Sequence, residues 1–198
     1  MEYKKDILNL LNDLKSLGLS RREVEERLSY KTHYIADLAR DMFLFSFYTH
    51  GMRFQNVATM PPVHGSVIQY RMNKGKKIRE ISIHPKLKGI IDKYNGKPYL
   101  FPLLKSEPLN QWELKEMTDK ANALINLYLK RVAVICGIEK RLTFHIARHT
   151  FAYLSLDNGV SYEILKDALG HSSYSTTQMY LKSLSDRKIN EAVKALYE

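Results

Sequence analysis

The sequence has one cysteine and no long apolar run, and each of these absences excludes a class of protein. Cys136 stands alone among 198 residues, so no intrachain disulfide can form and nothing indicates an oxidising compartment. The longest apolar stretch, Met42–Tyr48, is far shorter than the ~20 residues that cross a bilayer. The amino terminus is charged and lacks the apolar core of a signal peptide. We therefore expect a soluble, cytoplasmic protein with no membrane partner.

Positive charge is abundant and unevenly distributed. The formal net charge is +10, and residues 71–97 hold nine basic side chains against two acidic ones. Residues 1–30, by contrast, hold six of each sign. A concentrated basic patch attracts a polyanion, most often nucleic acid. The alternative interpretation is a solvated lysine-rich surface, and charge alone does not decide between the two.

The first half of the chain predicts helices followed by a hairpin. Short amphipathic helices are expected at residues 3–17 and from Ser20 onward, and a longer one over about 33–49, ending before Gly51. The carboxyl-terminal half of that longer helix is apolar nearly all round, which is typical of a central buried helix. Two β-branched segments, at 66–72 and 78–84, flank the turn-like residues 73–77, and a third strand is expected near 59–63.

The second half predicts mostly helix. A short helix is expected at residues 85–94, an extended segment at 99–102, and a long helix at about 111–136 whose apolar residues recur at helical spacing. Four more helices are expected at 145–157, 161–168, 174–184 and 186–196. The predicted fold class is therefore mainly α with a small antiparallel β-sheet (α+β).

Four short motifs occur in a fixed order along the chain. Tyr48-Thr-His-Gly-Met-Arg53 ends the apolar helix, and Lys74 lies in the predicted hairpin turn. A His145-x-x-Arg148 motif follows, then Gly170-His171, and Tyr180 nine residues after that histidine. Together these motifs resemble the signature of the tyrosine recombinases, the phage-integrase type of enzyme, over about residues 31–190. A single motif would carry little weight, but the ordered set is specific.

The resemblance implies a tyrosine recombinase catalytic-domain fold, as in DNA breaking-rejoining enzymes, and a set of site residues. Tyr180 would be the nucleophile, since a tyrosine hydroxyl forms a covalent intermediate that conserves the phosphodiester bond energy. Arginine suits the phosphate clamp, because its planar fork donates two hydrogen bonds and keeps its charge. No metal or cofactor is expected, because the arginines would neutralise the phosphate. The implied catalytic residues are Tyr180, Arg53, Lys74, His145, Arg148 and His171.

Proton transfer accounts for the remaining members of that set. Lys74 would protonate the departing 5′-oxygen, and neighbouring cations would lower its pKa enough for that role. Lys76 and Lys77 are alternative candidates for the same acid. His145 and His171 would donate to the phosphate or take the proton of the nucleophile.

The function implied by the resemblance is site-specific DNA recombination, by integration or excision, through a 3′-phosphotyrosyl intermediate. The partner would be double-stranded DNA carrying attachment sites, which places the protein at the nucleoid. Active recombinases of this type work as tetramers on DNA, with a monomer as the alternative for an isolated domain. Four basic side chains of the 71–97 patch are expected to contact DNA: Arg71, Lys76, Lys77 and Arg79.

Three alternatives stay open. Residues 154–169 are also compatible with a helix-turn-helix in a non-catalytic DNA-binding regulator, which would need neither Arg53 nor Tyr180. The same tyrosine chemistry serves type IB topoisomerases. His145 and His149, four residues apart, could bind zinc on a helix, but no third ligand lies at a suitable distance in the sequence.

Two features depart from the family pattern. Relatives commonly carry an acidic residue three positions after the first arginine, where this chain has Asn56, so we expect Arg53 to be held less rigidly. The expected domain organisation is a helical appendage or linker remnant at 1–30 and a catalytic domain at 31–198, with a carboxyl-terminal helix at about 186–197. Thirty residues are too few for the amino-terminal DNA clamp of a complete recombinase, which favours a fragment of a longer integrase.

Overall fold

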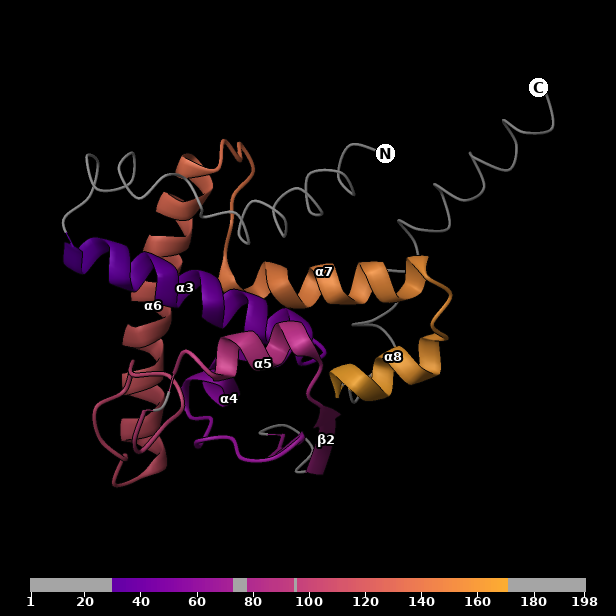
Figure 1. Cartoon of the computed structure of the whole chain (residues 1–198), viewed down its shortest axis with the longest axis horizontal. Coiled ribbons are helices and arrows are strands. Elements are labelled where there is room, and N and C mark those ends of the chain that lie inside the picture. Colours follow the sequence, from indigo (N-terminus) through magenta and orange to yellow (C-terminus); the bar gives the residue numbers. More distant parts are fainter. Residues whose placement is uncertain (1–29, 73–77, 95, 171–198) are drawn as a thin grey trace.

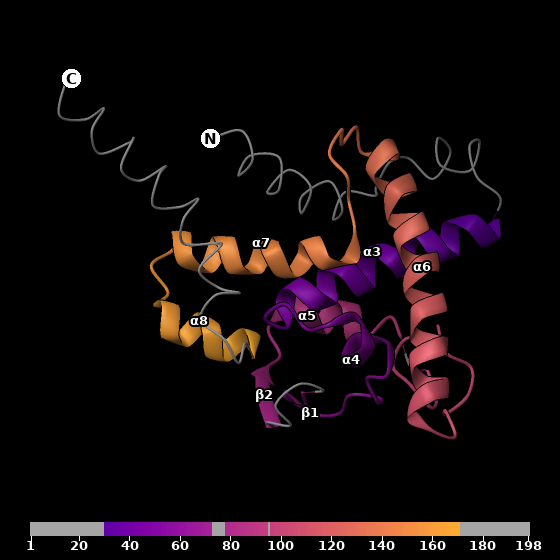
Figure 2. The same cartoon turned by 180° about the vertical axis from the view of Figure 1, so that it is seen from behind.

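The structure is a computed structural model, and it describes residues 30–72, 78–94 and 96–170. The elements in these ranges are α3 (Tyr30–Tyr48), α4 (Phe54–Ala58), β1 (Val67–Arg71), β2 (Ile78–Ser82), α5 (Pro85–Ile91), α6 (Gln111–Ile135), α7 (Phe144–Asp157) and α8 (Tyr162–Leu169). Figures 1 and 2 show α3 at the centre, with α6 and α8 at opposite sides of the molecule. The predicted class, mainly α with a small antiparallel sheet, is confirmed. The helices expected at 3–17, from Ser20, at 174–184 and at 186–196 lie outside the described residues.

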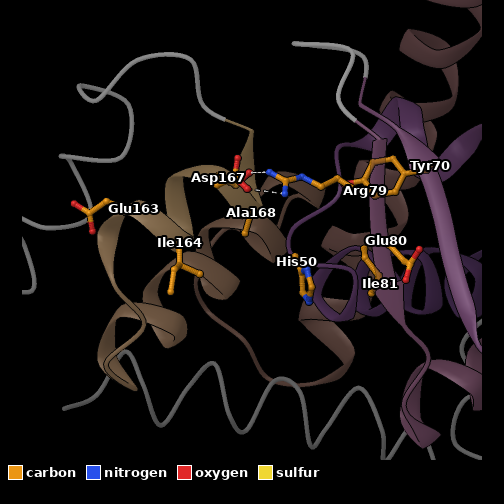
Figure 3. Close-up of a pocket in the computed structure, with 9 residues that line it drawn as sticks. All are labelled: His50, Tyr70, Arg79, Glu80, Ile81, Glu163, Ile164, Asp167 and Ala168. Carbon is orange, nitrogen blue, oxygen red and sulfur yellow. Dashed lines mark hydrogen bonds and ion pairs between the residues drawn. The ribbon is translucent and has the colours of Figure 1, made fainter.

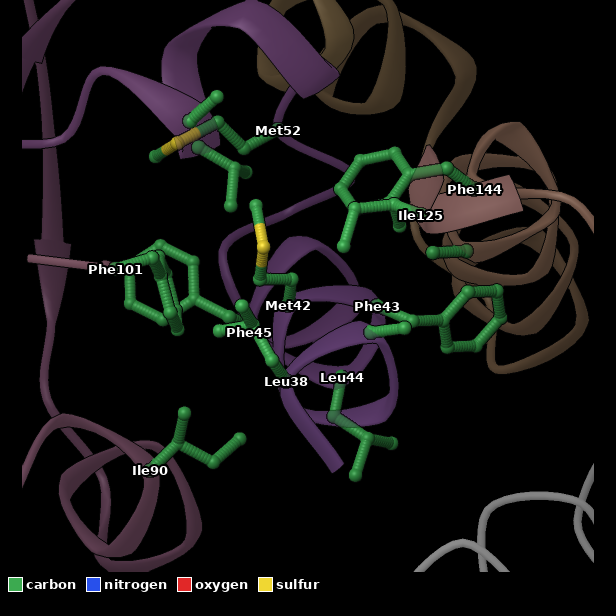
Figure 4. Packing of buried hydrophobic residues seen from close by; sticks show 14 of the residues in the cluster. Leu38, Met42, Phe43, Leu44, Phe45, Met52, Ile90, Phe101, Ile125 and Phe144 are labelled. Carbon is green, nitrogen blue, oxygen red and sulfur yellow. The ribbon is translucent and has the colours of Figure 1, made fainter. Parts of the chain in front are cut away.

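The core is built around α3, which is buried on nearly all sides. Met42, Phe43, Leu44 and Phe45 are each no more than 5% exposed. Figure 4 shows these side chains pointing in different directions from one helix, and the Phe45 ring meets Phe101 edge-on at 5.2 Å. Truncating such a buried phenylalanine to alanine costs about 3–5 kcal/mol. The prediction of a central buried helix is confirmed, although α3 begins at Tyr30.

The long helix α6 packs across α3 and has well-defined ends. The Asn110 side chain accepts a hydrogen bond from the Glu113 main-chain N–H at 2.9 Å, and Glu113 accepts one from the Leu109 N–H at 2.7 Å. This reciprocal capping stabilises the first turn. Along the helix the apolar stripe is buried from its middle onward, at Ala121, Ile125, Tyr128 and Val132. Leu114, Met117 and Ile135 nearer the two ends are half-buried, and Leu124 is 37% exposed. Among the described helices, none combines the length and apolar character that a bilayer-spanning helix needs.

A buried carboxylate ties α3 to the segment after α5. Asp41 is 2% exposed, and its side chain accepts hydrogen bonds from Arg40, Lys93 and Tyr94 at 2.7–3.0 Å. Burial, and then the charge of Asp41, raise the pKa of the Tyr94 hydroxyl above its ordinary value. A buried carboxylate needs such partners, because its desolvation is costly without them.

The hairpin of β1 and β2 is antiparallel, with Ile68 opposite Ile81 and Tyr70 opposite Arg79. Ile68 and Ile81 are buried on the inner face of this two-stranded sheet. Because side chains alternate along a strand, Tyr70 and Arg79 share that inner face, and Arg71 lies on the outer one. Both predicted strands are confirmed.

Two of the expected local structures are wrong. Residues 59–63 form no strand; this segment contains Pro61 and Pro62, which have no N–H to donate to a ladder. Residues 99–102 form bends and a turn in place of an extended segment, and the Leu100 N–H donates to the Met60 carbonyl at 2.6 Å. The short helix α4 was not predicted, since five residues are too few to show a helical period.

Candidate active site

The helix α7 carries two of the predicted site residues, and its first turn is anchored on two other helices. The Phe144 N–H donates to the Asn126 side chain of α6 at 2.8 Å. The Phe144 ring is buried and meets Phe54 of α4 edge-on, with ring centroids 4.9 Å apart. His145 and Arg148 follow at a spacing of three residues, which puts them on one face of this anchored helix.

Arg148 is buried and joins two distant parts of the chain. Its side chain is 4% exposed, and Nη1 donates to the Gly51 carbonyl at 2.8 Å. Nη2 donates to the Leu169 carbonyl at the end of α8. A guanidinium bound at two separate carbonyls is fixed in orientation as well as in position, because its donors form a planar fork.

The close approach of α3 to α7 depends on glycine at position 51. Gly51 has φ of +72°, which side-chain-bearing residues rarely adopt. A Cβ built there would lie 2.9 Å from Arg148 Cγ and 3.1 Å from Arg148 Cα. The sequence predicted Gly51 as the residue that ends the helix, and the structure adds that its missing side chain leaves room for Arg148.

Arg53 follows this turn and is brought to the same place as His145 and Arg148. Arg53 precedes α4 in an extended conformation, with φ of −67° and ψ of 150°, and its side chain is exposed. The positive charges of both Arg148 and Arg53 lower the pKa of His145. Two arginines that are 95 positions apart in the sequence therefore act on one imidazole.

His145 is held in its neutral form at neutral pH. Burial, the neighbouring His149 and the two arginines lower its pKa from 6.5 to about 4. The ring of His149 lies edge-on to that of His145, with 4.4 Å between centroids, and its own pKa is lowered by burial and by Arg148. A neutral imidazole among guanidinium groups can donate one hydrogen bond or accept a proton. An anion is the ligand that such a cluster favours.

Two residues that the sequence motifs did not single out lie beside this cluster. Burial raises the pKa of the Tyr70 hydroxyl, and the charges of Arg79, Arg148 and Arg53 oppose that rise. His50 has φ of 60° and stacks on the Phe151 ring at 5.3 Å, and burial followed by the charge of Arg79 lowers its pKa. The alternation of the predicted strand could have indicated Tyr70, because it shares a face with Ile68.

Arg71 and Arg79, both predicted to contact DNA, lie on opposite faces of the hairpin. Arg71 is exposed on the outer face. Arg79 points inward and pairs with Asp167 of α8, with Nη1 and Oδ2 2.7 Å apart. Figure 3 shows the Arg79 side chain reaching from β2 to α8. No observation tests a DNA contact by either residue, but their environments are clearly different.

A pocket of about 490 Å³ opens between the hairpin and α8. Figure 3 shows that Glu163, Ile164 and Asp167 form the α8 wall, with His50 and the strand residues opposite. The acidic side chains on this wall give α8 a surface unlike that of a helix that contacts DNA phosphates. The turn between α7 and α8 does match the predicted helix-turn-helix outline, with Gly159 at φ of +82°. The lining residues are His50, Tyr70, Arg79, Glu80, Ile81, Glu163, Ile164, Asp167 and Ala168.

The structure thus brings together three of the predicted catalytic residues, Arg53, His145 and Arg148. Arg71 and Arg79 lie on the hairpin, and the remaining predicted catalytic and DNA-contacting residues lie outside the described residues: Lys74, Lys76, Lys77, His171 and Tyr180. Their roles stay predictions.

Comparisons with known proteins give a consistent result. The model of the phage integrase family matches residues 19–187. A tyrosine recombinase of Pseudothermotoga lettingae is 30% identical over 138 residues, which are 66% of this chain and 43% of that protein. The tyrosine recombinase XerA of Pyrococcus horikoshii is 30% identical over 190 residues, or 91% of this chain and 62% of that protein. This chain thus spans about half the length of these two relatives.

The fold is also similar to that of solved structures. A crystal structure of the XerH site-specific recombinase, bound to a palindromic difH substrate in a post-cleavage complex, superposes with a TM-score of 0.65. The similarity covers 98% of this chain and 52% of that one, at 18% sequence identity. At this identity the superposition shows a shared fold, which is the fold implied by the sequence motifs.

Proposed function

Because this chain belongs to the phage integrase family, we propose that it cuts and rejoins double-stranded DNA at specific sites through a 3′-phosphotyrosyl intermediate. The observation that carries the proposal is the buried Arg148 guanidinium on the helix that also bears His145, with Nη1 bound to the Gly51 carbonyl two residues before Arg53. Such a cluster has the donors and the charge to hold a phosphodiester.

The proposed cleavage step exchanges one bond to phosphorus for another. The phenolic oxygen of Tyr180 attacks the phosphorus, and the bond from phosphorus to the 5′-oxygen breaks. The proton of Tyr180 passes to a neighbouring base, for which His145 and His171 are the candidates. Lys74 gives a proton to the departing 5′-oxygen. A 5′-hydroxyl of a partner strand then attacks the phosphotyrosine and releases Tyr180, and two such rounds exchange both strands through a Holliday junction.

The two arginines stabilise charge in this scheme. Negative charge grows on the non-bridging oxygens as the nucleophile approaches, and guanidinium donors aimed at them lower the barrier. Arg148 is held rigidly by the Gly51 and Leu169 carbonyls, whereas Arg53 is exposed and lies at the edge of the site. We therefore assign Arg148 the fixed half of the phosphate clamp and Arg53 the half that closes on the DNA.

Double-stranded DNA is the proposed partner. The basic stretch at 71–97 and the DNA substrate in the XerH complex both support it. We further propose that residues 31–198 form the catalytic domain after an appendage at 1–30, and that the active form is a tetramer on DNA at the nucleoid. A helix-turn-helix regulator is less well supported, because regulation needs no cluster of Arg53, His145 and Arg148.

Trapping a covalent complex tests the proposal with duplexes of many sequences at once. The 198-residue chain is incubated with a pool of randomised duplexes that carry nicks, so that a cut strand loses its 5′-hydroxyl fragment and cannot be rejoined. DNA that stays attached to protein in denaturant is then recovered. Wild type and the matched control Tyr34→Phe, at a phenol that is 49% exposed, should both yield adducts. Tyr180→Phe should yield none; duplex binding by wild type with no adduct would favour the regulator.

A second substrate identifies the residue that protonates the departing 5′-oxygen. A 5′-bridging phosphorothiolate leaves as a thiol, which needs no proton, so it should restore cleavage by Lys74→Ala. Without that rescue, Lys76 or Lys77 becomes the candidate acid.

A further inference from the structure

The apolar contacts of α8 are mainly with α7 and the turn between the two helices, where Phe151, Tyr153 and Val160 pack against a small buried cluster. Leu165 and Leu169 of α8 pack with Ala152 and Leu156 of α7 in a small buried cluster, separate from the main core around α3. Ile164 lies outside this cluster, on the wall of the pocket, and is 63% exposed. Polar contacts add to this cluster in fixing the position of α8.

Two arginines bind the carboxyl-terminal end of α8. Arg148 donates to the Leu169 carbonyl, and Arg79 donates to the Asp167 carbonyl and to the Asp167 side chain. The last carbonyls of a helix lack partners within the helix and carry its partial negative charge, so guanidinium groups stabilise this end. The two arginines come from α7 and β2, which meet at α8.

Arg79 is placed for this contact and poorly placed for a groove of DNA. It shares the inner face of the hairpin with Ile81, and its side chain is 21% exposed. Its Nε lies 3.4 Å from the Met72 sulfur, and its Nη1 lies 2.7 Å from Asp167 Oδ2. The guanidinium of Arg79 is thus directed across the pocket to α8 (Figure 3).

We infer that the ion pair of Arg79 and Asp167 positions Arg148 for the scissile phosphate, by fixing the end of α8 that binds the Arg148 guanidinium. Arg79 is then a positioning residue, in place of the DNA contact that its charge suggested. The inference rests on the proposed function, because it concerns the phosphate clamp of that same site. A displacement of about 1 Å in a group that orients a reacting centre slows a reaction by up to about 100-fold.

The rate of adduct formation at saturating protein tests this role. Arg79→Ala and Asp167→Asn should each slow cleavage of a recovered duplex by about 10- to 100-fold. The double variant should be no slower than Arg79→Ala, because that single variant already removes the contacts of Arg79 with both the side chain and the carbonyl of Asp167. Asp119→Asn is the matched control; it removes a carboxylate from an exposed ion pair with Lys115 on α6, 3.3 Å long.

DNA affinity separates positioning from DNA contact. Loss of a phosphate contact lowers the slope of log affinity against log salt by about 1 and weakens binding. We expect Arg79→Ala to keep the wild-type slope on a mixed-sequence duplex. Asp167→Asn removes a negative charge that would repel DNA. If Arg79 contacts DNA, this variant should therefore bind DNA more tightly and cleave it normally. If Arg79 positions Arg148, this variant should cleave DNA more slowly. A reduced slope for Arg79→Ala, or normal cleavage by Asp167→Asn, would overturn the inference.

The NMR signals of the Arg148 guanidinium test the same role in the free protein, even if no DNA is cut. The Nη protons of Arg148, held at two carbonyls, should give separate NMR signals, assigned by their loss in Arg148→Lys. Asp167→Asn should merge them and Asp119→Asn should not. Unchanged Arg148 signals in Asp167→Asn would overturn the positioning role, whether or not the wild type cleaves DNA.

Discussion

Replacement of Gly51 by alanine should displace Arg148 and so disturb the candidate site, although Gly51 is not one of the predicted catalytic residues. Gly51 has φ of +72°, and the new Cβ would lie 2.9 Å from Arg148 Cγ. Because Arg148 is 4% exposed and bound at two carbonyls, it has little room to move without losing one of them. We expect Gly51→Ala to lower both the stability of the fold and the rate of DNA cleavage.

The magnitude follows from two separate costs. A side chain at positive φ costs about 1–2 kcal/mol, and forcing an extra carbon into a packed site costs a further ~1–3 kcal/mol. The sum is about 2–5 kcal/mol of unfolding free energy. For a domain of this size, that corresponds to a fall in melting temperature of about 4–20 °C. Thermal unfolding followed by circular dichroism measures it.

Gly137→Ala is the matched control. Gly137 has φ of +68°, yet a Cβ there would meet no atom of the described residues within 4 Å. It should therefore show only the backbone cost, about 1–2 kcal/mol, and should form the covalent DNA adduct at the wild-type rate. Equal stability losses in the two variants, or normal adduct formation by Gly51→Ala, would refute the contact between Gly51 and Arg148 as the reason for glycine.

Four further predictions concern the cluster and Asn56. Arg148→Lys should keep the charge but lose the fork, and so slow adduct formation by about 100- to 1,000-fold; cleavage within a few-fold of wild type would contradict the clamp. His145 should titrate in the free protein with a pKa of about 4 and with a higher pKa on phosphate-bearing DNA, since an anion favours the charged form; an NMR midpoint near 6.5 without DNA would contradict the burial of His145 beside His149 and the two arginines. Because this folded pKa is below the unfolded value, His145 should lower the unfolding free energy as the pH falls from about 6.5 to about 4, and His145→Asn should reduce that dependence in urea titrations. Asn56→Asp should speed adduct formation several-fold, since a carboxylate three residues after Arg53 binds a guanidinium more strongly than an amide does; slower cleavage would mean that Asn56, 8% exposed, serves packing.

Strong periodic patterns in the sequence predicted most of the described fold. The apolar stretch Met42–Tyr48 indicated the buried centre of α3, and the segments on either side of residues 73–77 indicated the hairpin. The third expected strand was wrong because the β-branched pattern outweighed Pro61 and Pro62, which cannot donate to a ladder. Hydrogen bonds between distant segments, such as that between Leu100 and Met60, leave no local signal.

The site was less predictable than the fold. The motifs indicated Arg53, His145 and Arg148 because the chemistry demands those residue types, and the structure brings the three together. Arg79 was grouped with surface cations because composition does not distinguish the two faces of a strand. The alternation of the strand does distinguish them, because Arg79 is two residues before the buried Ile81 and so lies on the same inner face. The pairing of Arg79 with Asp167, 88 residues later, could not be read from either local segment.

Identification of the residue that carries the DNA tests the central claim most directly. An adduct recovered from the nicked duplexes is digested with protease and nuclease, and the nucleotide-bearing peptide is sequenced by mass spectrometry. The free end of the cut strand is tested for a 5′-hydroxyl by enzymatic phosphorylation. We predict a nucleotide joined through its 3′-phosphate to Tyr180, and a 5′-hydroxyl on the released strand. A nucleotide on any other residue, or a 5′-phosphate linkage, would contradict the account.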